Sequence, residues 1–282
     1  GFSVVKGTDA TSYTNGSSQS YVGWTWDAGA GSSKTYAVTV VSDSGNKYRF
    51  DSFGTSAVTL DLEEGSTYTF DQSDSSNSGH PLRFSTTSNG THGGGSEYTT
   101  GVVTNGTPGS AGAYTRITVA AGAPTLYYYC SAHSGMGGQA NTNSTAGASN
   151  FDGSIQSTVR TNAEAGFSIL TYTAGTAGST VGHGLGATPE LIIVKSRTNS
   201  SSAWVVYHAS LGSSAYLVLN STAGAGTSSN YWGSPSSTTF GISSSGFANN
   251  SGDLVGYCFS AVSGYSSFGS YIGNGSADGP FV

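Results

Sequence analysis

A thiol, an imidazole and a thioether stand within seven residues near the middle of the chain. In the stretch "LYYYCSAHSGMGG" (126–138) these groups belong to Cys130, His133 and Met136, with three tyrosines before them and glycines after them. A thiolate, imidazole nitrogens and a weak axial thioether are the ligands of blue-copper sites. The spacing Cys-x2-His-x2-Met is short enough for one loop between two strands, so this segment predicts a copper site.

The fourth ligand must come from another part of the chain, and His80 is the natural candidate. In "SNSGHPLRF" this histidine stands just before an expected strand over 81–86, and Phe84 is placed to anchor that strand in a core. Met136 is the only methionine of the chain, and it falls where an axial ligand belongs. His92 lies in a glycine-rich stretch and is expected to be a solvent-exposed loop residue.

The elements that must position these residues are strands. Helical periodicity is almost absent, whereas short β-branched and aromatic runs recur between Gly, Asn and Ser clusters. Such a pattern is typical of sandwiches and barrels. We expect an all-β protein with strands near 34–41, 47–53, 57–62, 66–72, 81–86, 113–120 and 125–130, and again near 165–174, 189–197, 203–209, 215–221, 238–244 and 253–262.

The distribution of these runs predicts two domains, over 31–141 and 166–282. The polar segment 142–165 is interpreted as a linker or extended arm. Residues 1–30 are interpreted as the last strands of a partial repeat of the C-terminal domain. In this repeat Phe2 matches Phe240, and "VGW" at 22–24 matches "VGY" at 255–257.

Composition narrows the classes of function. Only 9% of the residues are charged, and the net charge is −6, so electrostatics give no reason to bind nucleic acid or an anionic membrane. No apolar run approaches the ~20 residues of a membrane-spanning helix. No catalytic triad order or paired carboxylate cluster stands out, so we do not expect an enzyme. Polar surface without charge suits viral, extracellular or fibrous β-proteins.

Residues 31–141 resemble the cupredoxins of the plastocyanin and amicyanin type. The resemblance rests on "AVTLDLEEGSTYTFDQ", "GHPLRF" and "LYYYCSAHSGMGG". It implies a Greek-key β-sandwich in which His80, Cys130, His133 and Met136 converge on copper at one end. A long glycine-rich insert at 86–112 departs from the family pattern and lies between the two halves of the expected site.

Residues 1–30 and about 150–282 resemble a repeat module of large tail-fibre-like structural proteins of marine cyanophages. The resemblance rests on "AGFSILTYTAGTAGSTVGHGLGATPELIIVKSR" and the aromatic C-terminal stretch. It implies a second β-sandwich or jelly-roll-like fibre module in a virion structural protein, such as a fibre, spike or capsid decoration. Incomplete modules at both ends predict a homo-oligomer on the particle surface, in contact with other virion proteins and with host glycans or proteins.

Two other functions stay open at this stage. One is a copper protein for electron transfer or copper capture. The other is a carbohydrate-binding adhesin that stacks sugars on aromatic side chains such as Trp24, Trp204, Tyr231 and Trp232. His183, His208 and Cys258 are expected to be structural residues rather than ligands.

Overall fold

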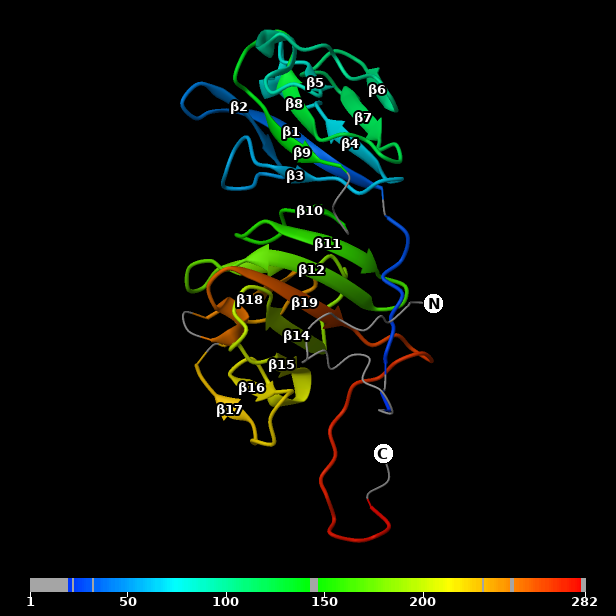
Figure 1. Cartoon of the computed structure of the whole chain (residues 1–282), viewed down its shortest axis with the longest axis vertical. Coiled ribbons are helices and arrows are strands. Elements are labelled where there is room, and N and C mark those ends of the chain that lie inside the picture. Colours follow the sequence, from blue (N-terminus) through cyan, green and yellow to red (C-terminus); the bar gives the residue numbers. More distant parts are fainter. Residues whose placement is uncertain are drawn as a thin grey trace.

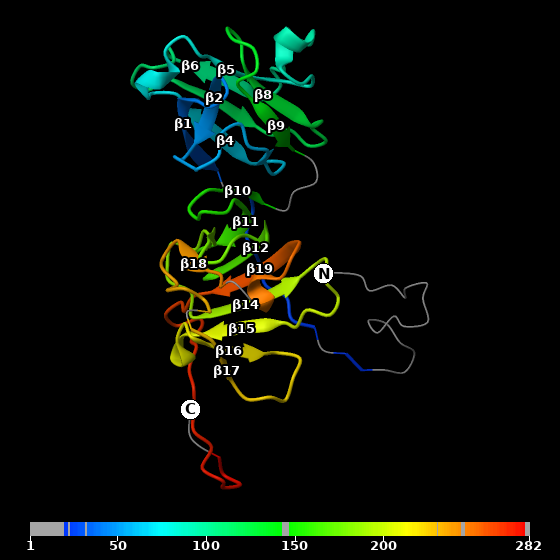
Figure 2. The same ribbon diagram turned by 90° about the vertical axis from the view of Figure 1, so that its left-hand side faces the viewer.

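A computed structural model describes residues 20–21, 23–31, 33–142, 147–229, 231–243 and 246–279. Over these ranges the chain forms strands, loops and short 3-10 turns, so the all-β prediction is confirmed. The strands build two lobes stacked along the long axis of the molecule, and the second view shows the same separation (Figures 1 and 2). In the described part of the chain no helix is long and apolar enough to cross a membrane.

The first lobe contains nine strands and two 3-10 turns. Inward and outward positions alternate along its strands, because successive side chains of a strand point to opposite faces of a sheet. Its elements are β1 (Lys34–Ser42), β2 (Asn46–Phe50), β3 (Leu60–Asp61), β4 (Thr67–Asp71), η1 (Ser75–Asn77), β5 (Leu82–Ser85), η2 (Gly90–Gly93), β6 (Val102–Asn105), β7 (Tyr114–Thr118), β8 (Leu126–Cys130) and β9 (Gly138–Asn141).

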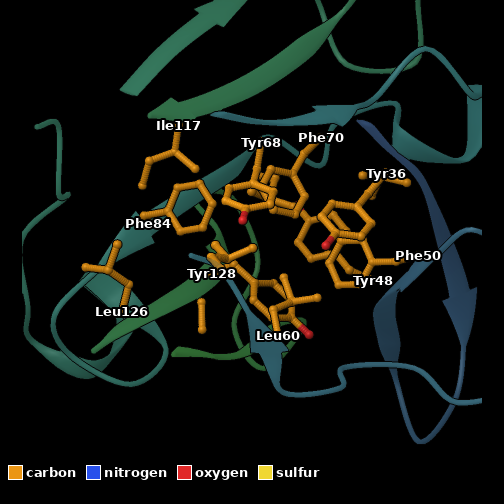
Figure 3. Packing of buried hydrophobic residues seen from close by; sticks show 14 of the residues in the cluster. Tyr36, Tyr48, Phe50, Leu60, Tyr68, Phe70, Phe84, Ile117, Leu126 and Tyr128 are labelled. Atoms are coloured by element: carbon orange, nitrogen blue, oxygen red, sulfur yellow. The ribbon is translucent and has the colours of Figure 1, made fainter. Parts of the chain in front are cut away.

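Two sheets of this lobe share one aromatic core. The strand orders are β2-β1-β4-β7-β6 and β3-β9-β8-β5. Rings from both sheets meet in the interior (Figure 3), where Phe70 packs against Phe84 at 5.5 Å between ring centroids and Phe50 against Tyr128 at 5.2 Å. The hydroxyl of Tyr128 donates to the carbonyl oxygen of Val58 at 2.7 Å. Tyr128 thus contributes apolar area to the core while its hydroxyl group keeps a hydrogen-bond partner.

The segment predicted as a linker carries structure instead. It contains β10 (Ala148–Asn150) and β11 (Ser157–Asn162), which pair with each other and continue into the large sheet of the second lobe. Phe151, between these strands, is buried in the core of the first lobe, 5.7 Å from Tyr36 between ring centroids. The prediction of a linker was wrong because single residues such as Phe151, in a mostly polar stretch, supply the packing.

Polar contacts also join the lobes along this segment. The backbone oxygen of Ser149 accepts hydrogen bonds from Lys34 Nζ and from the Tyr36 hydroxyl, both at 2.8 Å. Arg160 forms an ion pair with Glu63 at 3.0 Å. Contacts of this kind fix residues 148–162 against both lobes, so the segment is a junction between them.

The second lobe is built on one large sheet. Its order is β10-β11-β12-β19-β14-β15-β16-β17, and β13 and β18 form a separate pair. The remaining elements are β12 (Phe167–Thr173), β13 (Thr180–Gly182), β14 (Leu191–Ser196), β15 (Val205–His208), η3 (Ala209–Leu211), β16 (Ala215–Val218), β17 (Gly226–Thr227), β18 (Thr239–Gly241), η4 (Phe247–Asn249) and β19 (Asp253–Phe259).

One face of the large sheet covers the second core. Leu170, Ile192 and Cys258 point into it, and Trp232 from a loop is fully buried there. Burial raises the pKa of the Cys258 thiol well above its ordinary value, so this cysteine remains a neutral thiol. Its placement agrees with the structural role expected from the sequence.

The described part of residues 1–30 does not form the strands expected of a partial repeat. Residues 23–31 contain no strand, whereas their proposed repeat partner at 255–257 lies in β19; Phe2 and Val22 lie outside the described residues. After β19, residues 267–279 run as an extended segment that leaves the second lobe (Figures 1 and 2), and Tyr271 and Ile272 are exposed there. Among the described residues, those at 23–31 therefore do not repeat the strand found at 255–257.

Candidate metal centre

Strand pairing brings the two halves of the predicted site together. β5 and β8 are antiparallel neighbours, and Leu82 lies opposite Cys130. His80 stands two residues before Leu82, so it reaches the same end of the sheet as the loop that follows Cys130. The backbone nitrogen of Ser131 donates to the carbonyl oxygen of Pro81 at 3.0 Å and extends this pairing by one step.

Three of the four predicted ligands form a compact cluster. The Sγ atom of Cys130 lies 3.9 Å from Nδ1 of His80 and 3.7 Å from Nδ1 of His133. All three candidate ligand atoms lie within 4.8 Å of one another. Cys130 is buried, His80 is half-buried and His133 is exposed. The cluster therefore sits at the surface end of the core.

These distances suit a metal ion between the three side chains. A metal bonded to sulfur at about 2.3 Å and to imidazole nitrogen at about 2.0 Å, with an angle of about 120° between the bonds, holds the two ligand atoms about 3.7 Å apart. The two sulfur–nitrogen distances agree with this value to within a few tenths of an ångström. One thiolate and two imidazoles suit a soft or borderline metal such as copper or zinc.

Met136 follows the cluster on the same loop and is buried in the first core. Its backbone oxygen accepts a hydrogen bond from the backbone nitrogen of Tyr48 at 3.0 Å, which ties the end of the loop to β2. The structure thus places the methionine at the buried side of the loop. Its assignment as an axial ligand stays a prediction.

The backbone of His80 is held from inside the lobe. Its carbonyl oxygen accepts hydrogen bonds from the Tyr48 hydroxyl at 2.9 Å and from Gln72 Nε2 at 2.8 Å. Burial of its ring, with the His133 imidazole beside it, lowers the pKa of His80. A neutral ring is the form that binds metals, so this environment favours ligation at neutral pH.

The glycine-rich insert packs against the metal loop. The side-chain amide of Asn89 donates to Ser134 Oγ at 2.9 Å, and its oxygen accepts from the backbone nitrogen of Gly135 at 2.8 Å. His92 is exposed, as expected, but its Nε2 lies 3.0 Å from the carbonyl oxygen of Cys130, outside the three-residue cluster. These two hydrogen bonds of Asn89, called the Asn89 clamp below, could not be predicted, since nothing in the sequence distinguishes this asparagine from its neighbours.

The other histidines lie away from this cluster. His183 is fully buried; its Nδ1 accepts from the backbone nitrogen of Leu185 and its Nε2 lies 3.2 Å from the carbonyl oxygen of Ser236. His208 caps η3 by accepting a hydrogen bond from the backbone nitrogen of Ser210. Both residues make the structural contacts expected of them.

The aromatic side chains considered for sugar stacking have different surroundings. Tyr231 and Trp232 are buried in the second core, so the prediction that they present faces to a sugar was wrong. Trp204 is half-buried and stacks on Tyr257, with 6.4 Å between ring centroids. Trp24 is exposed. The sequence of an aromatic-rich loop does not show which of its rings lie in the core.

The fold and the cluster define a β-sheet protein of two lobes, one of which carries a Cys-His-His arrangement that can hold a metal ion. A family model described as Domain of unknown function (DUF7483) matches residues 140–282. The match spans about half of the chain and covers the second lobe from just before β10, and the chain belongs to this family. Searches of curated proteins and of solved structures found no match.

Proposed function

We propose that the first lobe is a copper-binding domain of the cupredoxin type. The observation that carries this proposal is the convergence of Cys130, His80 and His133 within 4.8 Å at the end of paired strands. The two-sheet packing around an aromatic core supports the Greek-key sandwich that the resemblance implies. Met136 favours copper over zinc as the resident metal, because a weak axial thioether belongs to copper sites.

Copper bound here would supply a redox-active centre, and the chain's own residues would hold and screen it. Cys130 lies inside the core, which limits the access of solvent to its sulfur, whereas His133 faces the surface. The exposed residues beside His133 are small: Ser131, Ala132, Ser134 and Gly135. Such a surface offers little apolar area for docking a redox partner, which favours a stabilising or copper-capturing role over electron transfer.

Metal content after dialysis against Cu(II) or Zn(II) tests this proposal. We expect the full chain to retain one copper ion and to prefer it to zinc, as the Irving–Williams order also requires. His80→Ala and His133→Ala should each lose the ion. His208→Ala, changed in the other lobe, is the matched control and should retain it. Equal copper contents in the wild-type protein and His133→Ala would contradict the proposal.

The larger role that we propose is a structural one in a phage virion, as a fibre, spike or capsid decoration whose second lobe is a sandwich or jelly-roll-like module. The resemblance of the second lobe to fibre modules, the all-β architecture and the low charge support it. The exposed Tyr271 and Ile272 favour association with a second copy of the chain, since isolated apolar side chains on an extended segment gain by burial.

Light scattering on the purified chain tests the self-association. We expect an oligomer in the wild-type protein and a smaller species in the double variant Tyr271→Ser/Ile272→Ser. Tyr21→Ser, which alters another exposed tyrosine, is the control. A monomeric wild-type protein would refute the proposed self-association but would not bear on the proposed metal site.

A further inference from the structure

The outer face of the large sheet carries an apolar row. Across three neighbouring strands, Phe167 of β12 pairs with Phe259 of β19, and Phe259 pairs with Leu191 of β14. On each of the three strands the core residues lie an odd number of positions from this row, after Phe167 and Leu191 and before Phe259, so the row faces the other way. Both phenylalanine residues are nonetheless buried, because Trp26 packs on both rings and Phe268 packs on Phe259.

A pocket of about 540 Å³ lies over this row. Trp26, from the segment before β1, stacks on Phe167 with ring centroids 6.0 Å apart and meets Phe259 edge-on at 5.4 Å. Tyr265, from the turn after β19, also lines the pocket. The volume falls within the ~300–1,000 Å³ that small-molecule sites occupy.

Two of the lining rings keep exposed surface. Trp26 is 53% exposed although it stacks on Phe167, and Tyr265 is 73% exposed. A ring that packs on one side and is open on the other offers a flat apolar platform. Exposed apolar surface that is contiguous with a groove is typical of ligand-binding and interaction sites.

The polar groups of the pocket define the charge of its ligand. Lys, Arg and His are absent from the described lining, so an anionic ligand would find no counter-charge. Asp27 and the hydroxyl-bearing Ser266 and Ser267 also line it, and they provide hydrogen-bond acceptors and donors. These groups disfavour an anionic ligand and suit one that has an apolar face for the rings and hydroxyl groups for the rim.

A pyranose sugar has this combination, since its C–H groups form one face and its hydroxyl groups the edge. We propose that the pocket formed by Trp26, Phe167, Phe259 and Tyr265 binds a neutral oligosaccharide. The site belongs to the second lobe and shares no residue with the metal cluster. The tests of sugar binding and of metal binding are therefore independent of each other.

Binding of the full chain to an array of immobilised neutral oligosaccharides of glucose, galactose and mannose tests the site. We expect binding to a subset of these glycans and a loss of affinity of about tenfold or more in Tyr265→Ala. Trp26→Ala should show a similar loss. Trp24→Ala, which alters an exposed tryptophan outside the pocket lining, is the matched control and should bind like the wild-type protein.

Tyr265 is mostly exposed, so Tyr265→Ala keeps the fold and remains informative if Trp26→Ala unfolds. Circular dichroism checks the fold of each variant. Silence of the wild-type chain on the array would overturn the proposal, as would equal binding by wild type and Tyr265→Ala. A third outcome is a wild-type dimer that binds no glycan and that Tyr265→Ala converts to a monomer. This outcome would show that a second copy of the chain occupies the pocket, and it would also overturn the sugar-binding proposal.

Discussion

The carbonyl oxygen of Pro81 accepts a hydrogen bond from the backbone nitrogen of Ser131 at 3.0 Å. Each of these residues follows a metal-ligand candidate, His80 in one case and Cys130 in the other. The bond therefore fixes the two halves of the cluster to each other through the backbone. A site held in this way exists before a metal arrives, so metal binding need not order the loop.

The role of Met136 is tested by Met136→Leu. Leucine fills nearly the same volume, so the variant should lose less than ~1.5 kcal/mol in free energy of unfolding. The copper complex should still form, because the thiolate and both imidazoles remain. Its reduction potential and visible spectrum should shift, since the axial ligand tunes both. Identical spectra of wild type and variant would remove Met136 from the ligand set.

The Asn89 clamp predicts a measurable contribution to stability. Asn89→Ala loses the hydrogen bonds to Ser134 and Gly135, at 2.9 and 2.8 Å. We expect urea unfolding of the metal-free protein to report a loss of about 1–2 kcal/mol. Asn105→Ala, which removes one exposed hydrogen bond to Gly112, should cost less. Equal losses in the two variants would mean that the insert does not hold the metal loop.

Phe151 tests whether residues 142–165 join the lobes. Its ring is buried against Tyr36, Phe50 and Phe53, so Phe151→Ala should destabilise the first lobe by about 3–5 kcal/mol. Val103→Ala, at an exposed position of β6, should change the free energy of unfolding by less than ~0.5 kcal/mol. Thermal unfolding measures both. A small effect at Phe151 would restore the linker interpretation.

His183 predicts a pH dependence of stability. Burial lowers the pKa of His183, while its bond to the Ser236 carbonyl acts in the opposite direction. The unfolded chain has the ordinary value of about 6.5. The stability tied to the neutral ring is thus fully present above pH ~6.5 and is lost as the pH falls from there towards the lowered pKa of the folded state.

Unfolding experiments between pH ~7 and ~5 should show this loss in the wild-type protein and a shallower slope in His183→Gln. Ser236→Ala keeps the backbone carbonyl and the titrating ring. It should therefore lower stability through its lost hydroxyl contacts without changing the slope. A slope that is the same in wild type and His183→Gln would exclude His183 as the source.

Sequence reasoning located most of the strands because their alternation is strong. The run around 126–130 and the run around 191–196 both lie where expected. The short strands β9 and β10 were missed, since glycine, asparagine and alanine carry little strand preference and the pairing partners decide their conformation. β6 was missed although it begins with two valines and a threonine, because it lies within the glycine-rich insert. Tertiary contacts of this kind leave no local signal.

Three of the four candidate ligands could be placed from sequence because ligand chemistry demands particular residue types at short spacing. The contacts that hold them could not. Tyr48, Gln72 and Asn89 reach the site from β2, from the end of β4 and from the insert, and each acts through a hydrogen bond to backbone or to a loop serine. Common polar residues make such bonds anywhere in a protein, so their positions become evident only in three dimensions.

The most direct test of the central claim is the visible absorption of the metal-free protein after addition of Cu(II). A copper ion bound to the Cys130 thiolate and to His80 and His133 gives an intense band near ~600 nm. We expect this band in the wild-type protein and its absence in Cys130→Ser, which keeps both imidazoles. Wild-type protein that stays colourless with Cu(II), or a band that survives in Cys130→Ser, would contradict the assignment of this cluster as a copper site.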